Sequence, residues 1–222
     1  MAAWLVKLSP PTPEEGLSRP MYIGAQALLA PEAAPDLVEL EQMRLVRAIE
    51  SYLEAARNGT GSALKPLHAA AVTLGLEIAR FLESLLRQPI SSELAARAIS
   101  LQRKQETLRA LEENILLFAE TLEQGGDREL SGRLLESLDT ILLTMADALQ
   151  SKEAMDLEML MVLTDDRGAS MERLRNRYGM EQSADAHDIA ALHYATTLFE
   201  RNVWLLRQLA LWLREDMKLA VV

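Results

Sequence analysis

One regular apolar pattern runs through residues 92–124, SELAARAISLQRKQETLRALEENILLFAETLEQ. Its members recur at spacings of three and four, which places them along one face of a helix. They are Leu94, Ala98, Leu101, Gln105, Leu108, Leu111, Ile115, Phe118 and Leu122. A second pattern of this kind consists of Ile189, Leu192, Thr196, Phe199, Val203, Leu206, Ala210 and Leu213. Two long helices, each with one apolar face, predict an all-α bundle with these helices as its spine.

Breaking and capping residues divide the remainder of the chain into further helices. Asn58-Gly59-Thr60-Gly61, Pro89 and Gly125-Gly126 are strong helix breakers. Asp36 with Glu39 is typical of a helix start, because the two can form a capping box. Helices are therefore expected over 36–57, 62–87, 92–124, 127–150, 152–177 and 183–216.

The predicted helix lengths repeat. From 36 and again from 127 they run short, medium and long, which predicts a duplicated three-helix unit covering 36–124 and 127–216. Residues 217–222 are expected to be a tail. Residues 1–35 contain six of the eight prolines, and this composition predicts an extended leader or linker.

Composition excludes several classes of function. The chain has 222 residues, a net charge of −10 and no cysteine. It therefore has no disulfide, thiolate metal site or cysteine nucleophile, and the absence of cysteine fits a reducing cytoplasm. The acidic balance disfavours nucleic-acid partners, since these bind basic surfaces. No apolar run approaches the roughly 20 residues of a membrane span, and no signal peptide is recognisable, so the chain is expected to be soluble.

Residue patterns typical of enzymes are missing. The sequence contains no G-x-x-x-x-G-K, G-x-S-x-G or H-E-x-x-H string. The neighbouring acids of Glu112-Glu113 and Asp165-Asp166 point about 100° apart on a helix, so solvated charge explains each pair better than acid–base catalysis. We expect no enzymatic activity, no catalytic residue and no cofactor.

His68 allows two interpretations. His187 and His193 are six residues apart and do not share a helix face, so they predict no metal site. His68 is preceded by Lys65 one turn earlier and could accept phosphate in a phosphorelay-type signalling bundle. The alternative is an ordinary, partly exposed histidine on a helix surface.

Two further patterns have an ordinary and a functional interpretation. Four arginines gather near the end of the fifth predicted helix: Arg167, Arg173, Arg175 and Arg177. They can complement the helix dipole, or they can contact anions or lipid headgroups.

In the last helix Trp204, Leu211 and Trp212 form a second apolar stripe. Either this stripe is buried between the two repeats, or it forms an interface with a second copy or a membrane partner.

Two short segments resemble the PhoU family. Leu101-Gln102-Arg103-Lys104-Gln105-Glu106 and Phe199-Glu200-Arg201-Asn202-Val203-Trp204 resemble the E-R-x-x-D segment on the third helix of each PhoU repeat. The leader segments 10–15, 18–23 and 28–31 resemble the region after the last membrane span of bacterial sodium/phosphate cotransporters. The resemblance implies a six-helix PhoU-like bundle that acts beside a transport domain at the cytoplasmic face of the membrane, because in that family a PhoU-like region follows the transport domain in one natural polypeptide.

The chain departs from the family where PhoU proteins bind metal clusters. That family uses both acids of E-R-x-x-D as ligands, which lie one turn apart on one helix face. Here Gln102 stands in place of the first acid and Glu106 in place of the second. In the other copy Glu200 is present, but Trp204 replaces the second acid and Arg201 is retained. The sequence therefore predicts no bound iron or zinc.

Together these features predict a non-catalytic, cytoplasmic regulatory domain linked to sodium-dependent phosphate transport. Its partners would be the membrane domain of a transporter or a second copy of the chain, which makes a homodimer one expected state. A phosphorelay bundle using His68 and a stand-alone helical adaptor are the alternatives.

Overall fold

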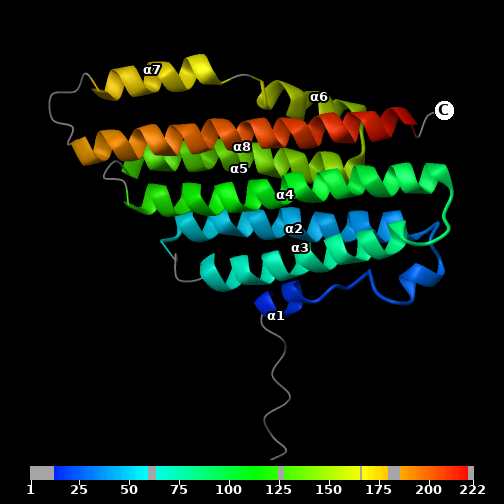
Figure 1. The fold of residues 1–222 in the computed structure, drawn as a ribbon. Coiled ribbons are helices and arrows are strands. Elements are labelled where there is room, and N and C mark those ends of the chain that lie inside the picture. The colour runs from blue at the N-terminus through cyan, green and yellow to red at the C-terminus, as the bar shows by residue number, and fades with distance from the viewer. Residues whose placement is uncertain (1–12, 60–63, 125–127, 166, 180–185, 220–222) are drawn as a thin grey trace, which may run out of the picture.

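In the computed structural model, residues 13–59, 64–124, 128–165, 167–179 and 186–219 are described, and they form a helical bundle without a strand (Figure 1). The predicted all-α class is confirmed. In chain order the elements are α1 (Pro13–Ser18), a 3-10 turn η1 (Ala27–Leu29), α2 (Ala34–Arg57), α3 (Leu64–Leu86), α4 (Ser92–Gln124), α5 (Arg128–Ser151), α6 (Ala154–Leu163), α7 (Gly168–Gly179) and α8 (Ala186–Leu219).

The long helices α4 and α8 contact each other more extensively than any other two elements of the described bundle. Every predicted apolar position on α4 is buried, and on α8 all are buried except Ile189, which is half-buried. Phe118 and Phe199 meet between them with ring centroids 6.2 Å apart. The predicted apolar faces of the two long helices are therefore confirmed.

The shorter helices pack on either side of this pair. α2, α3 and α4 contact one another, while α5, α6 and α7 are gathered around α8. Contacts between α4 and α8 and between α2 and α5 join the two groups. One core consequently runs through the whole described bundle. α8 extends to Leu219, so the helix includes the first residues of the predicted tail.

The fifth predicted helix, 152–177, is wrong as a single helix, because the structure divides it into α6 and α7. Arg207 of α8 donates hydrogen bonds to the carbonyl oxygens of Met161 and Thr164, at 3.2 and 3.1 Å. Arg167 donates a third, to the carbonyl oxygen of Leu163 at 3.0 Å. Helix ends leave such carbonyls unpaired. Guanidinium groups satisfy them here, so α6 can end without a further turn.

The leader is not extended throughout. Part of it forms α1, which packs against α3, and part forms η1. Ile23 and Ala27 belong to the core, being 8% and 9% exposed. The prediction of an extended leader is therefore wrong within 13–35, where proline at a first helical turn is compatible with a short helix. Residues 1–12 lie outside the described part of the chain.

Two side chains of α2 hold the leader. The Glu41 carboxylate is fully buried, and its Oε1 accepts the backbone N–H groups of Met21 and Tyr22 at 2.5 and 2.6 Å. Arg44 donates to Oε2 of Glu41 at 2.5 Å and to the carbonyl oxygen of Gly16 at 2.7 Å. Polar backbone groups of the leader thus have partners where the chain crosses the bundle.

The predicted capping box at Asp36 and Glu39 is wrong. α2 begins at Ala34 with a proline in its first turn, and no side chain caps it. Asp36 accepts a hydrogen bond from Arg97 of α4 at 2.5 Å instead. Glu39 pairs with Arg97 at 3.1 Å and with Lys152 at 2.9 Å. Both carboxylates therefore link separate segments of the chain rather than cap the helix.

Candidate functional site

The three residues predicted as a second stripe on α8 have different surroundings. Trp204 is 57% exposed, whereas Leu211 and Trp212 are half-buried. The Trp212 ring is covered by the Arg103 guanidinium of α4, 5.8 Å from the ring centroid. Its Nε1 is buried and has no hydrogen-bond partner among the described residues. Trp212 thus belongs to the α4–α8 contact, and of the two tryptophans on α8 Trp204 is the one presented outward.

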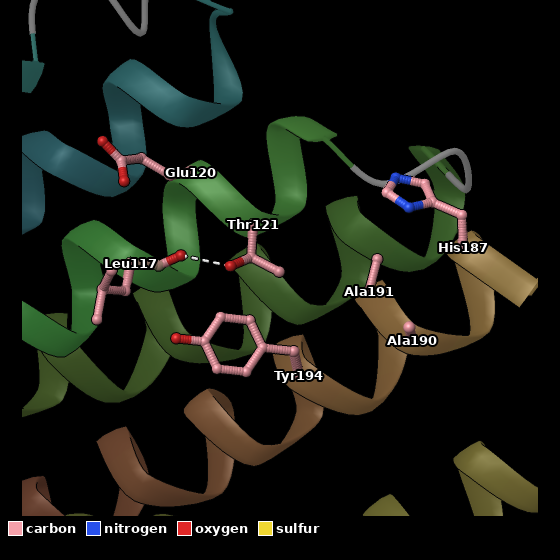
Figure 2. A pocket seen from close by; sticks show the side chains of 7 residues that line it. All are labelled: Leu117, Glu120, Thr121, His187, Ala190, Ala191 and Tyr194. Atoms are coloured by element: carbon pink, nitrogen blue, oxygen red, sulfur yellow. Dashed lines mark hydrogen bonds between the residues drawn. The ribbon is translucent and has the colours of Figure 1, made fainter.

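A hollow of about 330 Å³ opens between α4 and α8 (Figure 2). Its lining residues are Leu117, Glu120, Thr121, His187, Ala190, Ala191 and Tyr194. The short side chains of Ala190 and Ala191 leave this space, which Leu117 and Tyr194 border with 42% and 50% of their surfaces exposed. The Thr121 hydroxyl donates to the carbonyl oxygen of Leu117 at 2.7 Å. The hollow is therefore an apolar indentation with a polar edge.

The first PhoU-like segment lies on α4. Gln102 is half-buried, while Arg103 and Glu106 are exposed. Arg103 is engaged with Trp212, as described above. Lys104 is buried and forms an ion pair with Asp216 near the end of α8. These side chains link α4 to the last turns of α8 and leave Glu106 at the surface.

The second PhoU-like segment lies on α8, where Glu200 is occupied by an arginine. Arg175 of α7 donates to Oε2 of Glu200 at 2.5 Å and, through Nε, to the hydroxyl of Thr196 at 2.8 Å. Only 12% of the Arg175 side chain is exposed. Arg201 is exposed. The guanidinium supplies the positive charge that balances Glu200 in this structure.

These residues do not fit the metal cluster that the PhoU resemblance implies. Glu200 already binds a guanidinium, and the Trp204 indole cannot ligate a metal. Within the described ranges no three His, Asp or Glu side chains gather in a way that could hold a metal ion.

The structure joins His68 to a partner that the sequence did not indicate. Nδ1 of His68 lies 2.6 Å from Oε1 of Glu112, and the hydroxyl of Tyr52 donates to the same oxygen at 2.7 Å. Glu112 is 4% exposed. Solvated charge is therefore the wrong explanation for Glu112, while the exposed side chain of Glu113 agrees with it. The available signal was the helical spacing of Glu112, which is four residues after Leu108 and three before Ile115 of the apolar pattern.

Burial controls the protonation of this cluster. Desolvation raises the pKa of Glu112, although hydrogen bonds from Tyr52 and His68 partly oppose it. Burial, together with the Glu112 charge, raises the pKa of Tyr52 far above its usual value. Tyr52 is therefore a neutral hydrogen-bond donor at physiological pH, and it holds the Glu112 carboxyl in place.

The other sequence candidates are separated from this cluster. His187 and His193 are both exposed on α8, and His187 lines the hollow. The predicted arginine group is divided: Arg167 binds the end of α6 and Arg175 binds Glu200, while Arg173 and Arg177 are exposed. The helix-dipole interpretation agrees with Arg167, since its guanidinium lies at a helix C-terminus.

Across the described ranges, no helix combines the length and apolarity that crossing a bilayer requires. No protein-family model, curated protein or solved structure matches the chain significantly.

Proposed function

We propose that the chain is a non-catalytic regulatory and interaction domain of the PhoU type, which acts at the cytoplasmic face of a membrane beside a sodium-dependent phosphate transporter. It would act by contact. A bundle that binds one conformation of a transporter more tightly than another shifts the population toward the tighter-binding state.

The observation that supports an interaction role is the outward-facing Trp204 on α8. A tryptophan that is 57% exposed contributes little to the core of its own chain. Tryptophan is also a residue type that dominates binding energy when a partner buries it. The hollow beside Tyr194 lies on the same helix and offers a partner side chain a place to insert.

The arrangement of helices supports the comparison with a duplicated three-helix unit. α2 contacts α5 and α4 contacts α8, so helices in equivalent places of the proposed repeats pair with each other. The second helix of the second repeat would then correspond to α6 and α7 together. The association with phosphate transport is supported by sequence resemblance alone. The segments concerned are 101–106 on α4, 199–204 on α8 and the leader.

The pairing of charged side chains supports a role without catalysis. Lys104 pairs with Asp216, and Arg175 pairs with Glu200. Such pairs hold helices together, and neither is directed at the hollow, whose lining residues are different. A general acid or base must reach its substrate within hydrogen-bonding distance.

A binding experiment tests the proposal. The transport domain of a bacterial sodium/phosphate cotransporter is reconstituted into lipid vesicles, and the chain is titrated against these vesicles and against empty ones. We expect binding only where the transport domain is present. The Trp204→Ala variant should bind roughly 30-fold more weakly, since truncating an interface tryptophan costs about 2 kcal/mol.

The matched control is Leu143→Ala on α5, because Leu143 is 50% exposed and lies on a different helix. It should bind like the unmodified chain. Equal binding to empty vesicles, or equal binding by both variants, would contradict the proposal. Sedimentation of the chain alone distinguishes a transporter interface from a homodimer interface. If Trp204 is buried by a second copy, the chain sediments as a dimer and Trp204→Ala sediments as a monomer.

A further inference from the structure

His68 is fixed by a buried carboxylate rather than left to rotate at the surface. Nδ1 of His68 lies 2.6 Å from Oε1 of Glu112, and when Glu112 is ionised it can only accept, so Nδ1–H is then the donor of this hydrogen bond and keeps its proton. Tyr52 donates to the same Glu112 oxygen at 2.7 Å and is itself fully buried. The hydrogen bond from Tyr52 therefore fixes the position of the carboxylate that orients the imidazole.

This orientation presents the second ring nitrogen. When Nδ1 bears the proton of a neutral imidazole, the lone pair lies on Nε2, at the opposite edge of the ring. The His68 side chain is 29% exposed, whereas the Glu112 side chain is 5% exposed. Among the described residues, Nε2 has no hydrogen-bond partner. The lone pair thus lies on the ring edge that Glu112 does not contact, in a side chain that is partly exposed.

We propose that His68 accepts a phosphoryl group on Nε2 from an acyl phosphate. The Nε2 lone pair attacks phosphorus, the bond between phosphorus and the acyl oxygen breaks, and the donor leaves as a carboxylate. His68 keeps its Nδ1 proton, and the Glu112 carboxylate stabilises the positive charge that develops on the ring. The exposed Lys65, one turn earlier on α3, provides a cation near the incoming phosphate.

The choice of an acyl phosphate rests on its leaving group. An acyl phosphate already has a good leaving group, so an oriented nucleophile suffices. This modification is independent of the docking role of Trp204, because His68 lies on α3 and Trp204 lies on α8.

The three histidines of the chain provide an internal comparison. His187 and His193 are exposed, whereas His68 is only partly so. If accessibility alone governs reactivity, the two α8 histidines react first. If Glu112 activates His68, the order is reversed. A purely structural His68–Glu112 pair gives the first order, since it only restricts access.

The chain is incubated with acetyl phosphate, and phosphate on each histidine is quantified by mass spectrometry under non-acidic conditions. We expect His68 to be labelled at least about tenfold faster than His187 or His193, because a hydrogen bond to a charged group is large enough to change a rate by that factor. Alkaline hydrolysis should release the isomer phosphorylated on Nε2. In concentrated urea the preference for His68 should disappear.

Glu112→Gln tests the activation, because the amide oxygen still accepts a hydrogen bond but has no negative charge. His68 in this variant should fall to the labelling rate of the other two histidines, while Tyr52→Phe should retain the preference in part. Labelling in the order of exposure, the Nδ1 isomer, or an unchanged rate in a folded Glu112→Gln chain would each overturn the proposal. If that variant does not fold, the comparison among the three histidines of the unmodified chain decides.

Discussion

Replacing Glu41 by alanine should detach the leader from the bundle. The buried carboxylate accepts two backbone N–H groups and the guanidinium of Arg44, whose side chain is 16% exposed. Without it, two amides lose their acceptor, and the Arg44 guanidinium loses its counter-charge although it keeps the carbonyl oxygen of Gly16. Breaking a buried ion pair from one side costs about 3 kcal/mol, and the unpaired amides add to that cost.

Urea unfolding measures the loss, and hydrogen exchange at the amides of Met21 and Tyr22 locates it. We expect a lower midpoint together with much faster exchange at these two amides. Glu129→Ala is the control, since Glu129 is 77% exposed and, among the described residues, pairs only with Arg133 one turn away on α5. An unchanged midpoint and unchanged exchange in Glu41→Ala would refute the reasoning.

Three further expectations concern the folded state. Phe199→Ala should destabilise the chain by about 3–5 kcal/mol in urea unfolding, because the ring is 1% exposed and packs between α4 and α8. Asn202→Leu should raise the melting temperature, since neither amide atom of the buried Asn202 has a partner in the described part of the chain. Burial acts to raise the pKa of Glu39, but hydrogen bonds from Lys152 and Arg97 outweigh it and hold the pKa below its usual value. Stability from Glu39 is therefore present above about pH 4.3, its ordinary pKa, and is lost as the pH falls through the lower folded value; Glu39→Gln should flatten this part of the stability–pH curve.

The apolar faces of the long helices were predictable because they depend on local periodicity. Leu101 and Leu111, for example, recur at helical spacing and are buried as expected. The division of the fifth predicted helix was not predictable in this way. It depends on Arg207, more than forty residues from the carbonyls that it binds. Gly168 at the start of α7 was the local signal that helix 152–177 is interrupted.

Candidate site residues were identified less completely, because sequence spacing does not show which neighbour covers a side chain. Trp204 and Trp212 are equally apolar in the sequence, yet Arg103 of α4 covers only Trp212. Glu112 and Glu113 are adjacent acids, yet only Glu112 points to Tyr52 and His68. The helix register predicts the face on which a residue lies, whereas packing between helices determines its partner.

Sodium-driven phosphate uptake is the most direct test of the proposed regulatory role. Vesicles containing the transport domain of a sodium/phosphate cotransporter are assayed alone, with the chain, and with the Trp204→Ala or Leu143→Ala variant. We expect the chain and Leu143→Ala to change the uptake rate equally, and Trp204→Ala to leave it close to that of vesicles alone. An uptake rate that is the same in all four samples would contradict the proposal that the chain regulates transport by contact through α8.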